Sequence, residues 1–478
     1  MASKTTLNAK NLETLGAARL ADLLIEISTG SAVAKRRLRL ELAGAQSPQE
    51  AGREVAKRLI SIARARTFIN WQNRKTLVTD LESQLRAIKE QIAPTDPAAA
   101  LALVWQVMQV ATPVFERCDD SSGIVIGVFH DACTLLGEIA LAGKAPVEAL
   151  ADAVVDALRD NGYGQYDGLI ASVAPALGPG GLAHLKSRFQ ALAATPVPVP
   201  PKSDWKAVAY GTGGAYYAHQ LEERNRQSTV GIALKDIADA MGDVDGFMAQ
   251  YDPATRKMPQ IAANIAARLL AAGRAEEALG VIEAVEFRDR DWVPADWQAV
   301  RLEVLEALGQ GGAAQAFRLA CFQRNLDAAH LRAYLKRLAD FDDVDAEDKA
   351  MAYAMAFPAL SAALLFLIEW PALDRAAQVV LKRFAGLDGN QYEILTGAAA
   401  ALAPRHPLSA TLTLRAMIDF TLNGGKSSRY PHVARHLAEC EALAGQIDDF
   451  GAFEPHAAYL ARLRREHGRK TGFWAHFA

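Results

Sequence analysis

The sequence predicts an all-α fold, an α-solenoid of antiparallel helix hairpins of the tetratricopeptide or HEAT type. Three observations predict it: a hairpin pattern at residues 260–284, a recurring turn signal towards the C-terminus, and a core rich in leucine and alanine. Hydrophobic residues make up 51% of the chain, but aromatic residues only 7%. Alanine and leucine lose little side-chain freedom in a helix, so this composition favours helices over strands.

The hairpin pattern lies in Gln260–Ala284, QIAANIAARLLAAGRAEEALGVIEA. In its first half, Ile261, Ile265 and Leu269 recur at the spacing of a single helix face. Gly273 ends that helix, because glycine readily adopts the positive φ favoured after a helix C-terminus. Neither helix can bury its apolar face alone, so both must pack on each other and on neighbours.

Similar turn signals follow at Gly309, Asp340, Pro371 and Pro404, with successive spacings of 36, 31, 31 and 33 residues. Helix-pair repeats of the tetratricopeptide type have a period of about 34 residues. The spacings therefore favour a series of stacked hairpins. The alternative is an ordinary helical domain whose loops are evenly spaced.

Composition and terminal sequence indicate a compartment. The four cysteines are widely spaced and form no CxxC pair, which suits buried thiols in a reducing compartment better than disulfides. The opening residues MASKTTLNAKNLETLG lack the apolar core of a secretory signal. The longest apolar runs, 101–115 and 354–368, are shorter than the roughly 20 residues of a membrane span. We therefore expect a cytoplasmic protein with no membrane contact.

The domain boundary is expected at a proline-rich segment. Residues 195–203, TPVPVPPKS, cannot form a helix and favour an extended linker. We expect an N-terminal helical domain at 1–194, a Pro/Gly-rich linker and loop at 195–227, and a C-terminal helical-repeat domain at 228–478. The glycine-rich stretch 210–215 lacks the lysine of a phosphate-binding loop, so a flexible connector is expected there.

The most basic stretch of the chain is a candidate binding surface. Residues 35–75 contain eleven Lys and Arg but three acidic residues, and the helical pattern breaks near 68–73. The candidate partner-binding residues in this stretch are Arg36, Arg37, Arg64, Arg66, Trp71, Arg74 and Lys75. Cationic side chains beside an aromatic ring could bind a protein, or hold nucleic-acid phosphates while a base stacks. The alternative is a solvated helix face with Trp71 in the core.

Two acidic residues and a histidine–cysteine series are further candidates. Asp119 and Asp120, in FERCDDSSG, could contact a cation or a basic partner, or simply form a turn. His432, His436 and Cys440 recur every four residues and could present one metal-binding helix face, although no fourth ligand is suitably spaced. The sequence contains no catalytic motif of the hydrolase, zinc-protease or phosphate-loop type, so we expect no catalytic residue and no cofactor.

Several segments resemble known proteins. FERCDDSSG, APALGPGGLAHLKSRF (Ala174–Phe189), LLAAGRAEEAL and YLKRLADFDDVDAED (Tyr334–Asp348) resemble a bacterial all-helical family described only as a domain of unknown function. The tail from RYPHVARHLAECEAL to HGRKTGFW is similar to helical regions that follow SWIM-type zinc fingers, but the finger's Cys and His pairs are absent. The resemblance implies a helical fold and no catalytic residue.

These observations lead to a functional expectation. Stacked hairpins offer a long surface to a partner, so we expect a non-catalytic scaffold that binds a protein or peptide. A nucleic-acid-binding protein that uses the basic N-terminal helices is the first alternative. A metal-dependent enzyme built on the histidine–cysteine series or on Asp119 and Asp120 is the second.

Overall fold

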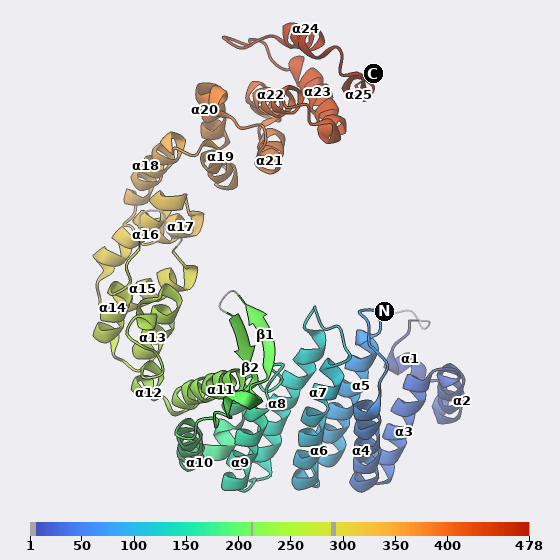
Figure 1. The fold of residues 1–478 in the computed structure, drawn as a ribbon. Coiled ribbons are helices and arrows are strands. Elements are labelled where there is room, and N and C mark those ends of the chain that lie inside the picture. The colour runs from blue at the N-terminus through green and yellow to red at the C-terminus, as the bar shows by residue number, and fades with distance from the viewer. Residues whose placement is uncertain (1–5, 212–213, 288–292, 478) are drawn as a thin grey trace. The chain divides into compact units, whose positions relative to one another are not determined.

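The computed structural model describes residues 6–211, 214–287 and 293–477. Within these ranges the chain is built almost wholly from helices, so the predicted all-α class is confirmed (Figure 1). Internal contacts divide the chain into two compact units, Met1–Trp297 and Gln298–Ala478. Each unit is described by itself below.

Helices, with one short pair of strands, make up the first unit. Its elements are α1 (Ala9–Glu13), α2 (Gly16–Ser28), α3 (Ala32–Gln46), α4 (Pro48–Arg64), α5 (Arg74–Ala87), the π-helix η1 (Ile88–Ile92), α6 (Pro97–Gln109), α7 (Ala111–Phe115), α8 (Ile124–Ala142), α9 (Val147–Arg159), α10 (Leu169–Ala193), η2 (Lys202–Asp204), β1 (Ala207–Gly211), β2 (Gly214–Tyr217), α11 (Ala218–Met241), α12 (Val244–Met248), η3 (Thr255–Lys257), α13 (Pro259–Ala271) and α14 (Ala275–Glu283). Helix α15 (Ala295–Ala307) begins at the end of this unit.

The helices of the first unit pack in series. Helix α3 packs on α4, α4 on α6, α6 on α8, and α8 on α10, which also contacts α9 and α11. Figure 1 shows α3 to α9 standing side by side. Helices α8 and α10 approach closely, since a Cβ on Gly137 would lie 2.0 Å from the carbonyl oxygen of Ser172. This packing buries one continuous hydrophobic core, which includes Val55, Val104 and Phe129.

Two helical stretches are apolar and long. Pro97–Phe115 and Ile124–Ala142 could cross a membrane by length and composition alone. The first is longer than the apolar run 101–115 because Pro97 and the alanines after it join the helix. Both stretches supply buried residues to the core of the first unit, Val107 and Leu136 among them. The core helix of a soluble protein meets the same criterion, so these stretches are weak evidence for a membrane protein.

The proline-rich segment lies inside the first unit, which differs from the expected boundary. Helices α10 and α11, before and after the segment, pack on each other. Of the expected flexible connector 210–215, residues 212 and 213 lie outside the described residues, and the rest belongs to the antiparallel strands β1 and β2, in which Tyr210 lies opposite Ala215. Helix α11 already begins at Ala218, so the end of the predicted linker 195–227 is helical.

The predicted hairpin at residues 260–284 is confirmed. Helix α13 ends at Ala271, α14 begins at Ala275, and Gly273 between them has a φ of +75°. The other four turn signals, at residues 309, 340, 371 and 404, all fall between consecutive helices. The turn chemistry therefore located these helix boundaries correctly.

Helices alone form the described part of the second unit. Its elements after α15 are α16 (Gly311–Asn325), α17 (Ala328–Leu335), α18 (Asp342–Ala356), α19 (Leu360–Glu369), α20 (Leu373–Arg383), η4 (Phe384–Gly386), α21 (Tyr392–Leu402), α22 (Pro407–Asn423), η5 (Ser427–Arg429), α23 (Tyr430–Ala444), α24 (His456–His467) and α25 (Thr471–Trp474). Besides packing on neighbours in sequence, α18 contacts α20, α19 contacts α21, and α20 contacts α22. Contacts between second neighbours are consistent with stacked helix hairpins.

Candidate functional site

Two loops of the first unit bring together four of the nine predicted binding residues, namely Arg66, Trp71, Asp119 and Asp120. We call these two loops the loop pair: residues 65–73, between α4 and α5, and residues 116–123, between α7 and α8. The Ile69 amide donates to the carbonyl of Arg117 at 2.7 Å, and the Asp119 amide donates to the carbonyl of Ile69 at 3.0 Å. This parallel bridge joins the basic stretch to the acidic turn, which the sequence analysis treated as separate candidates.

Arg117 holds the loop pair in place. Its Nη1 donates to the carbonyl of Thr67 at 3.0 Å, and its Nη2 donates to the carbonyl of Ile62 at 3.1 Å. Ile62 lies in the last turn of α4, and its carbonyl also accepts from the Ala65 amide at 3.3 Å. Burial lowers the pKa of the Arg117 guanidinium from its usual value. Arg117 was not predicted as a site residue, because a single arginine in a turn carries no signal of its contacts.

The first loop presents two aromatic side chains to solvent. Phe68 and Trp71 are each 63% exposed, so the alternative that Trp71 lies in the core is wrong. Arg74 lies below the surface, at 8% exposed. Its Nε donates to the carbonyl of Trp71 and its Nη1 donates to the hydroxyl of Ser121, both at 3.5 Å. Arg74 therefore positions Trp71 and links the two loops.

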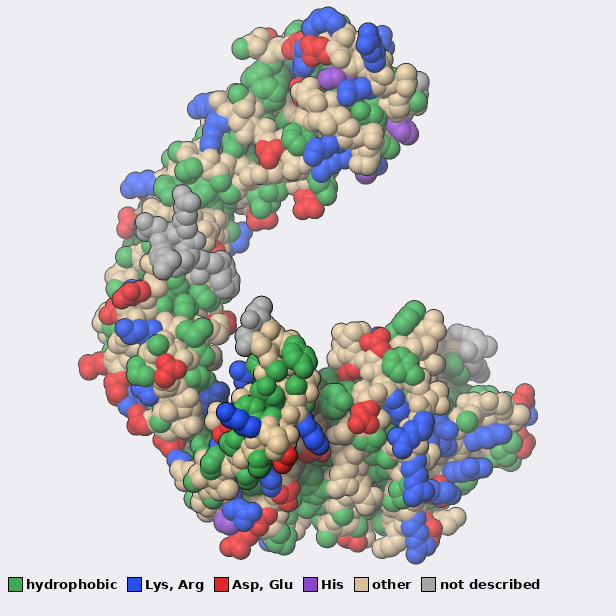
Figure 2. Space-filling view, viewed as in Figure 1, with side chains coloured by type: hydrophobic (Ala, Val, Ile, Leu, Met, Phe, Trp, Pro, Cys, Tyr) green, Lys and Arg blue, Asp and Glu red, His purple; other side chains and the backbone are tan. Residues whose placement is uncertain are grey.

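The remaining cations fall into two groups. Arg36 pairs with Asp80 at 3.5 Å and Arg37 with Glu41 at 2.7 Å, so acidic neighbours neutralise these predicted candidates. The other group is Arg64, Arg66 and Lys75, whose side chains are exposed. None of them forms an ion pair within the described ranges, in contrast to Arg36 and Arg37. Figure 2 shows Lys and Arg side chains gathered over the part of the first unit that holds α3 and α4. The unpaired cations instead flank Trp71 in the sequence.

The two acidic candidates have different roles. Both carboxylate oxygens of Asp120 accept hydrogen bonds from the Val125 amide, at 3.1 and 3.2 Å, and one accepts from the Ile126 amide at 2.9 Å. Asp120 therefore satisfies free amides at the start of α8 and is structural. Asp119 accepts from the Ser121 amide at 3.2 Å, and hydrogen bonds from Ser121 lower the pKa of its carboxyl. An ionised Asp119 thus adds a negative charge to the loop pair.

The side chains of the loop pair favour binding over covalent chemistry. Its cysteine, Cys118, has its thiol pKa raised, first by burial and then by the nearby charge of Asp120. A protonated thiol is a poor nucleophile, so this arrangement does not favour covalent chemistry. Exposed aromatic rings and unpaired arginines are instead the kinds of group enriched at protein-binding hot spots.

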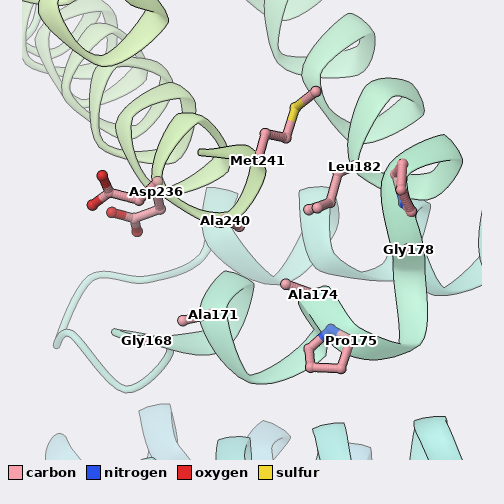
Figure 3. Close-up of a pocket in the computed structure, with 11 residues that line it drawn as sticks. Gly168, Ala171, Ala174, Pro175, Gly178, Leu182, Asp236, Ala240 and Met241 are labelled. Atoms are coloured by element: carbon pink, nitrogen blue, oxygen red, sulfur yellow. The ribbon is translucent and has the colours of Figure 1, made fainter. Parts of the chain in front are cut away.

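A groove between α10 and α11 is a second candidate that the sequence analysis did not find (Figure 3). Its volume is about 730 Å³, and apolar groups including Ala171, Leu182 and Met241 line it. Figure 3 shows Asp236 on the far side of this groove from Leu182. Burial, and then the charge of Asp239, raise the pKa of Asp236 to about 6. Asp239 itself forms a bidentate pair with Arg268.

The histidine–cysteine series does not converge on one point. Cys440 is buried in the core of the second unit, where its thiol faces the Thr411 carbonyl at 3.8 Å. His432 is exposed, and its Nδ1 accepts a hydrogen bond from Arg435 at 2.7 Å. His436 lies 3.5 Å from Glu439, and burial lowers the pKa of its imidazole. No set of three or more suitable side chains forms a metal site within the described part of the chain.

Comparisons with known proteins define the family. No curated protein matches this chain. Among solved structures it is similar to a homology model of the full-length AP-3 complex in an intermediate open conformation, at 11% identity. That match covers 97% of this chain and 84% of the other, with a TM-score of 0.17 that supports no argument about shared architecture. A model of a family of unknown function (DUF6880) matches residues 2–476, and the chain therefore belongs to this family.

Proposed function

We propose that this protein is a non-catalytic, cytoplasmic helical-repeat scaffold that binds a protein or peptide partner through the loop pair. The main support for this proposal is that Phe68 and Trp71 are exposed on a loop held by a main-chain bridge and by Arg117. Trp and Arg dominate binding hot spots, because each combines a large contact area with a directional polar group. A loop that is already ordered loses little entropy when a partner binds.

The charges around Trp71 specify the kind of partner. Arg64, Arg66 and Lys75 are exposed and flank the aromatic pair in the sequence, and Asp119 supplies one carboxylate. An acidic segment that carries an apolar side chain complements this surface. The rings would bury its apolar side chain, while the arginines would bind its carboxylates through charge-assisted hydrogen bonds.

The test compares interaction partners of two aromatic variants. The full chain is immobilised as wild type, as the double variant Phe68→Ala/Trp71→Ala, and as the control Tyr210→Ala. Tyr210 is 81% exposed on β1, outside the loop pair, so the control removes a comparable ring. Proteins retained from a lysate of the native host are quantified by mass spectrometry. We expect at least one protein to be retained by wild type and control but lost from the double variant.

A second double variant, Arg64→Glu/Arg66→Glu, tests the contribution of positive charge. It should fail to retain the protein that the aromatic double variant loses. Direct titration of that protein, once purified, should show affinity reduced by roughly tenfold or more in both double variants. If all variants retain the same proteins in the same amounts, the loop pair is not the binding surface and the proposal fails.

Binding to single-stranded nucleic acid is the second candidate, and the three unpaired cations that flank Trp71 in the sequence favour it. A labelled oligonucleotide would be titrated at several salt concentrations and followed by fluorescence anisotropy. Three phosphate contacts predict a slope of about −2 for log affinity against log salt. Binding with that slope that Trp71→Ala abolishes would support nucleic acid over protein. Absence of binding at low salt would remove this candidate.

A further inference from the structure

A pocket in the second unit carries an inference beyond the scaffold function. It lies between α21, α22, the short helix η5 and the first turns of α23, and its volume is about 350 Å³. The polar side chains in its wall include Thr421, Ser428, Arg429, His432 and Arg435. It contains two of the three residues that the sequence analysis considered for a metal, but their neighbours are mainly cationic.

The two arginines are held in place by neutral groups. Nη1 of Arg429 donates to the side-chain oxygen of Asn390 at 3.1 Å, and its guanidinium lies 4.8 Å from the ring centre of Tyr392. Arg435 donates to Nδ1 of His432 at 2.7 Å. Neither arginine has a carboxylate within ion-pair distance among the residues that the structure describes. Each therefore retains unused N–H donors and a full positive charge.

Other groups at the pocket add to this positive potential. When Nδ1 of His432 accepts from Arg435, the neutral imidazole carries its proton on Nε2 and is a donor there. Ser428 and Arg429, in η5, directly precede α23, and His432 lies in its first turn. Helix α23 has 15 residues, and the helix dipole favours an anion at its beginning. The one carboxylate in the wall, Glu439, lies 3.5 Å from His436.

These charges argue against a metal and for an anion. A cation entering the pocket would meet two uncompensated guanidiniums, and Nδ1 of His432 is already used by Arg435. A dianion would be attracted by both guanidiniums and could accept hydrogen bonds from the hydroxyls of Ser428 and Thr421. Met417 and Val433 supply an apolar part of the wall. The volume of 350 Å³ is at the small end of ligand pockets, which suits one ring or one side chain.

We propose that this pocket of the second unit binds a phosphate monoester with a small apolar body. Arg429 and Arg435 contact the phosphate oxygens, because guanidinium groups match phosphate geometry with paired hydrogen bonds. Tyr392, Met417 and Val433 contact the ester group. The ester can be a free metabolite or a phosphorylated side chain of a peptide, since both present the same chemistry to the pocket.

Isothermal titration calorimetry of the full chain tests the proposal with phenyl phosphate as the probe. Inorganic phosphate, phenol and a phosphotyrosine peptide are titrated in parallel. We expect phenyl phosphate to bind, phenol not to bind, and inorganic phosphate to bind more weakly because it lacks the apolar part. Equal affinity of phenyl phosphate and the peptide would indicate that the side chain suffices. Tighter binding of the peptide would identify a phosphopeptide as the source.

Variants then locate the binding site. Arg429→Gln and Arg435→Gln should each weaken phenyl phosphate binding by about tenfold or more, since each removes a charge-assisted hydrogen bond. Arg405→Gln is the matched control, an exposed arginine in the same unit that does not line the pocket. Circular dichroism checks that the variants fold. Absence of phenyl phosphate binding at millimolar concentration, or equal binding by all three variants, would overturn the proposal.

Discussion

Replacing Gly137 by alanine tests how the first unit holds its helices together. Gly137 lies in α8 where this helix meets α10, and an added Cβ would lie 2.0 Å from the carbonyl oxygen of Ser172. Gly127, in the same helix, has no neighbouring atom within 4 Å of such a Cβ. The two variants, Gly137→Ala and Gly127→Ala, therefore change the same helix by the same methyl group and differ only in what that group meets.

The expected magnitude follows from that contact. Carbon–oxygen contacts of this kind are comfortable at about 3.3 Å, so α8 and α10 must separate by about 1.3 Å at Gly137. Overpacking in a core costs about 1–3 kcal/mol, and a rigid backbone carbonyl places this case near the upper value. Both variants gain the same helix preference of alanine over glycine, about 0.5–1 kcal/mol. The opening free energies of the two variants should thus differ by about 3 kcal/mol.

Hydrogen exchange measured by mass spectrometry is the suitable assay, because a chain of two compact units need not unfold in one step. Peptides from α8 and α10 should exchange faster in Gly137→Ala than in wild type, and slower in Gly127→Ala. Peptides from α19 and α20, in the second unit, serve as the internal control and should not change. If Gly137→Ala protects α8 as well as Gly127→Ala does, the close approach is not a feature of the folded protein.

Three further predictions concern the candidate sites. Because the folded-state pKa of Asp236 is about 6, above its usual 3.8, the stability that its protonated form contributes should be lost as pH rises through 6. After a discount for partial exposure we expect a loss of about 1–2 kcal/mol between pH 4 and 8, absent in Asp236→Asn and measurable by exchange in α11. Asp120→Ala should destabilise the start of α8 by about 1 kcal/mol, whereas Asp119→Ala should stay within about 0.5 kcal/mol, again by exchange. Arg117→Met should remove the side-chain donor of the Thr67 carbonyl and one of the two donors of the Ile62 carbonyl, so that exchange in residues 65–73 accelerates about tenfold or more.

Local chemistry in the sequence predicted much of the fold. Glycine and proline located the turns at residues 273, 309, 371 and 404, because their backbone preferences act within a few residues. Ser47, followed by Pro48 and Glu50, has the residue types of a helix start, and its hydroxyl accepts from the Glu50 amide at 3.1 Å. The β-hairpin was missed because Tyr210 and its neighbours are exposed and show no alternation of apolar and polar residues. The Gly137 contact depends on how two helices meet, which no short window of sequence contains.

The candidate site was predicted only in pieces. Trp71 and Asp119 were named individually, but their proximity comes from a main-chain bridge between loops almost fifty residues apart. For Asp236 the sequence contains only an indirect indication that a carboxyl is partly buried. Asp236 lies three residues after Ala233 and directly before Ile237, and both of these apolar residues of α11 are buried. The interpretation of His432 and His436 as metal ligands did not include Arg429 and Arg435. Charge from neighbouring side chains, rather than histidine spacing, decides what such a pocket attracts.

The exposed aromatic pair also sets a lower limit on the partner's size. Phe68 and Trp71 are 63% exposed, so a partner could cover about 250 Å² of their surface. At about 25 cal/mol per Å², that burial contributes about 6 kcal/mol. Loss of translational and rotational freedom on association costs about 4–15 kcal/mol, so the two rings alone leave at most about 2 kcal/mol, which is weaker than millimolar binding. A partner held by the loop pair must therefore also engage the arginines and bury a standard interface of roughly 1,200 Å² or more. A short peptide that binds tightly to the loop pair alone would contradict this reasoning.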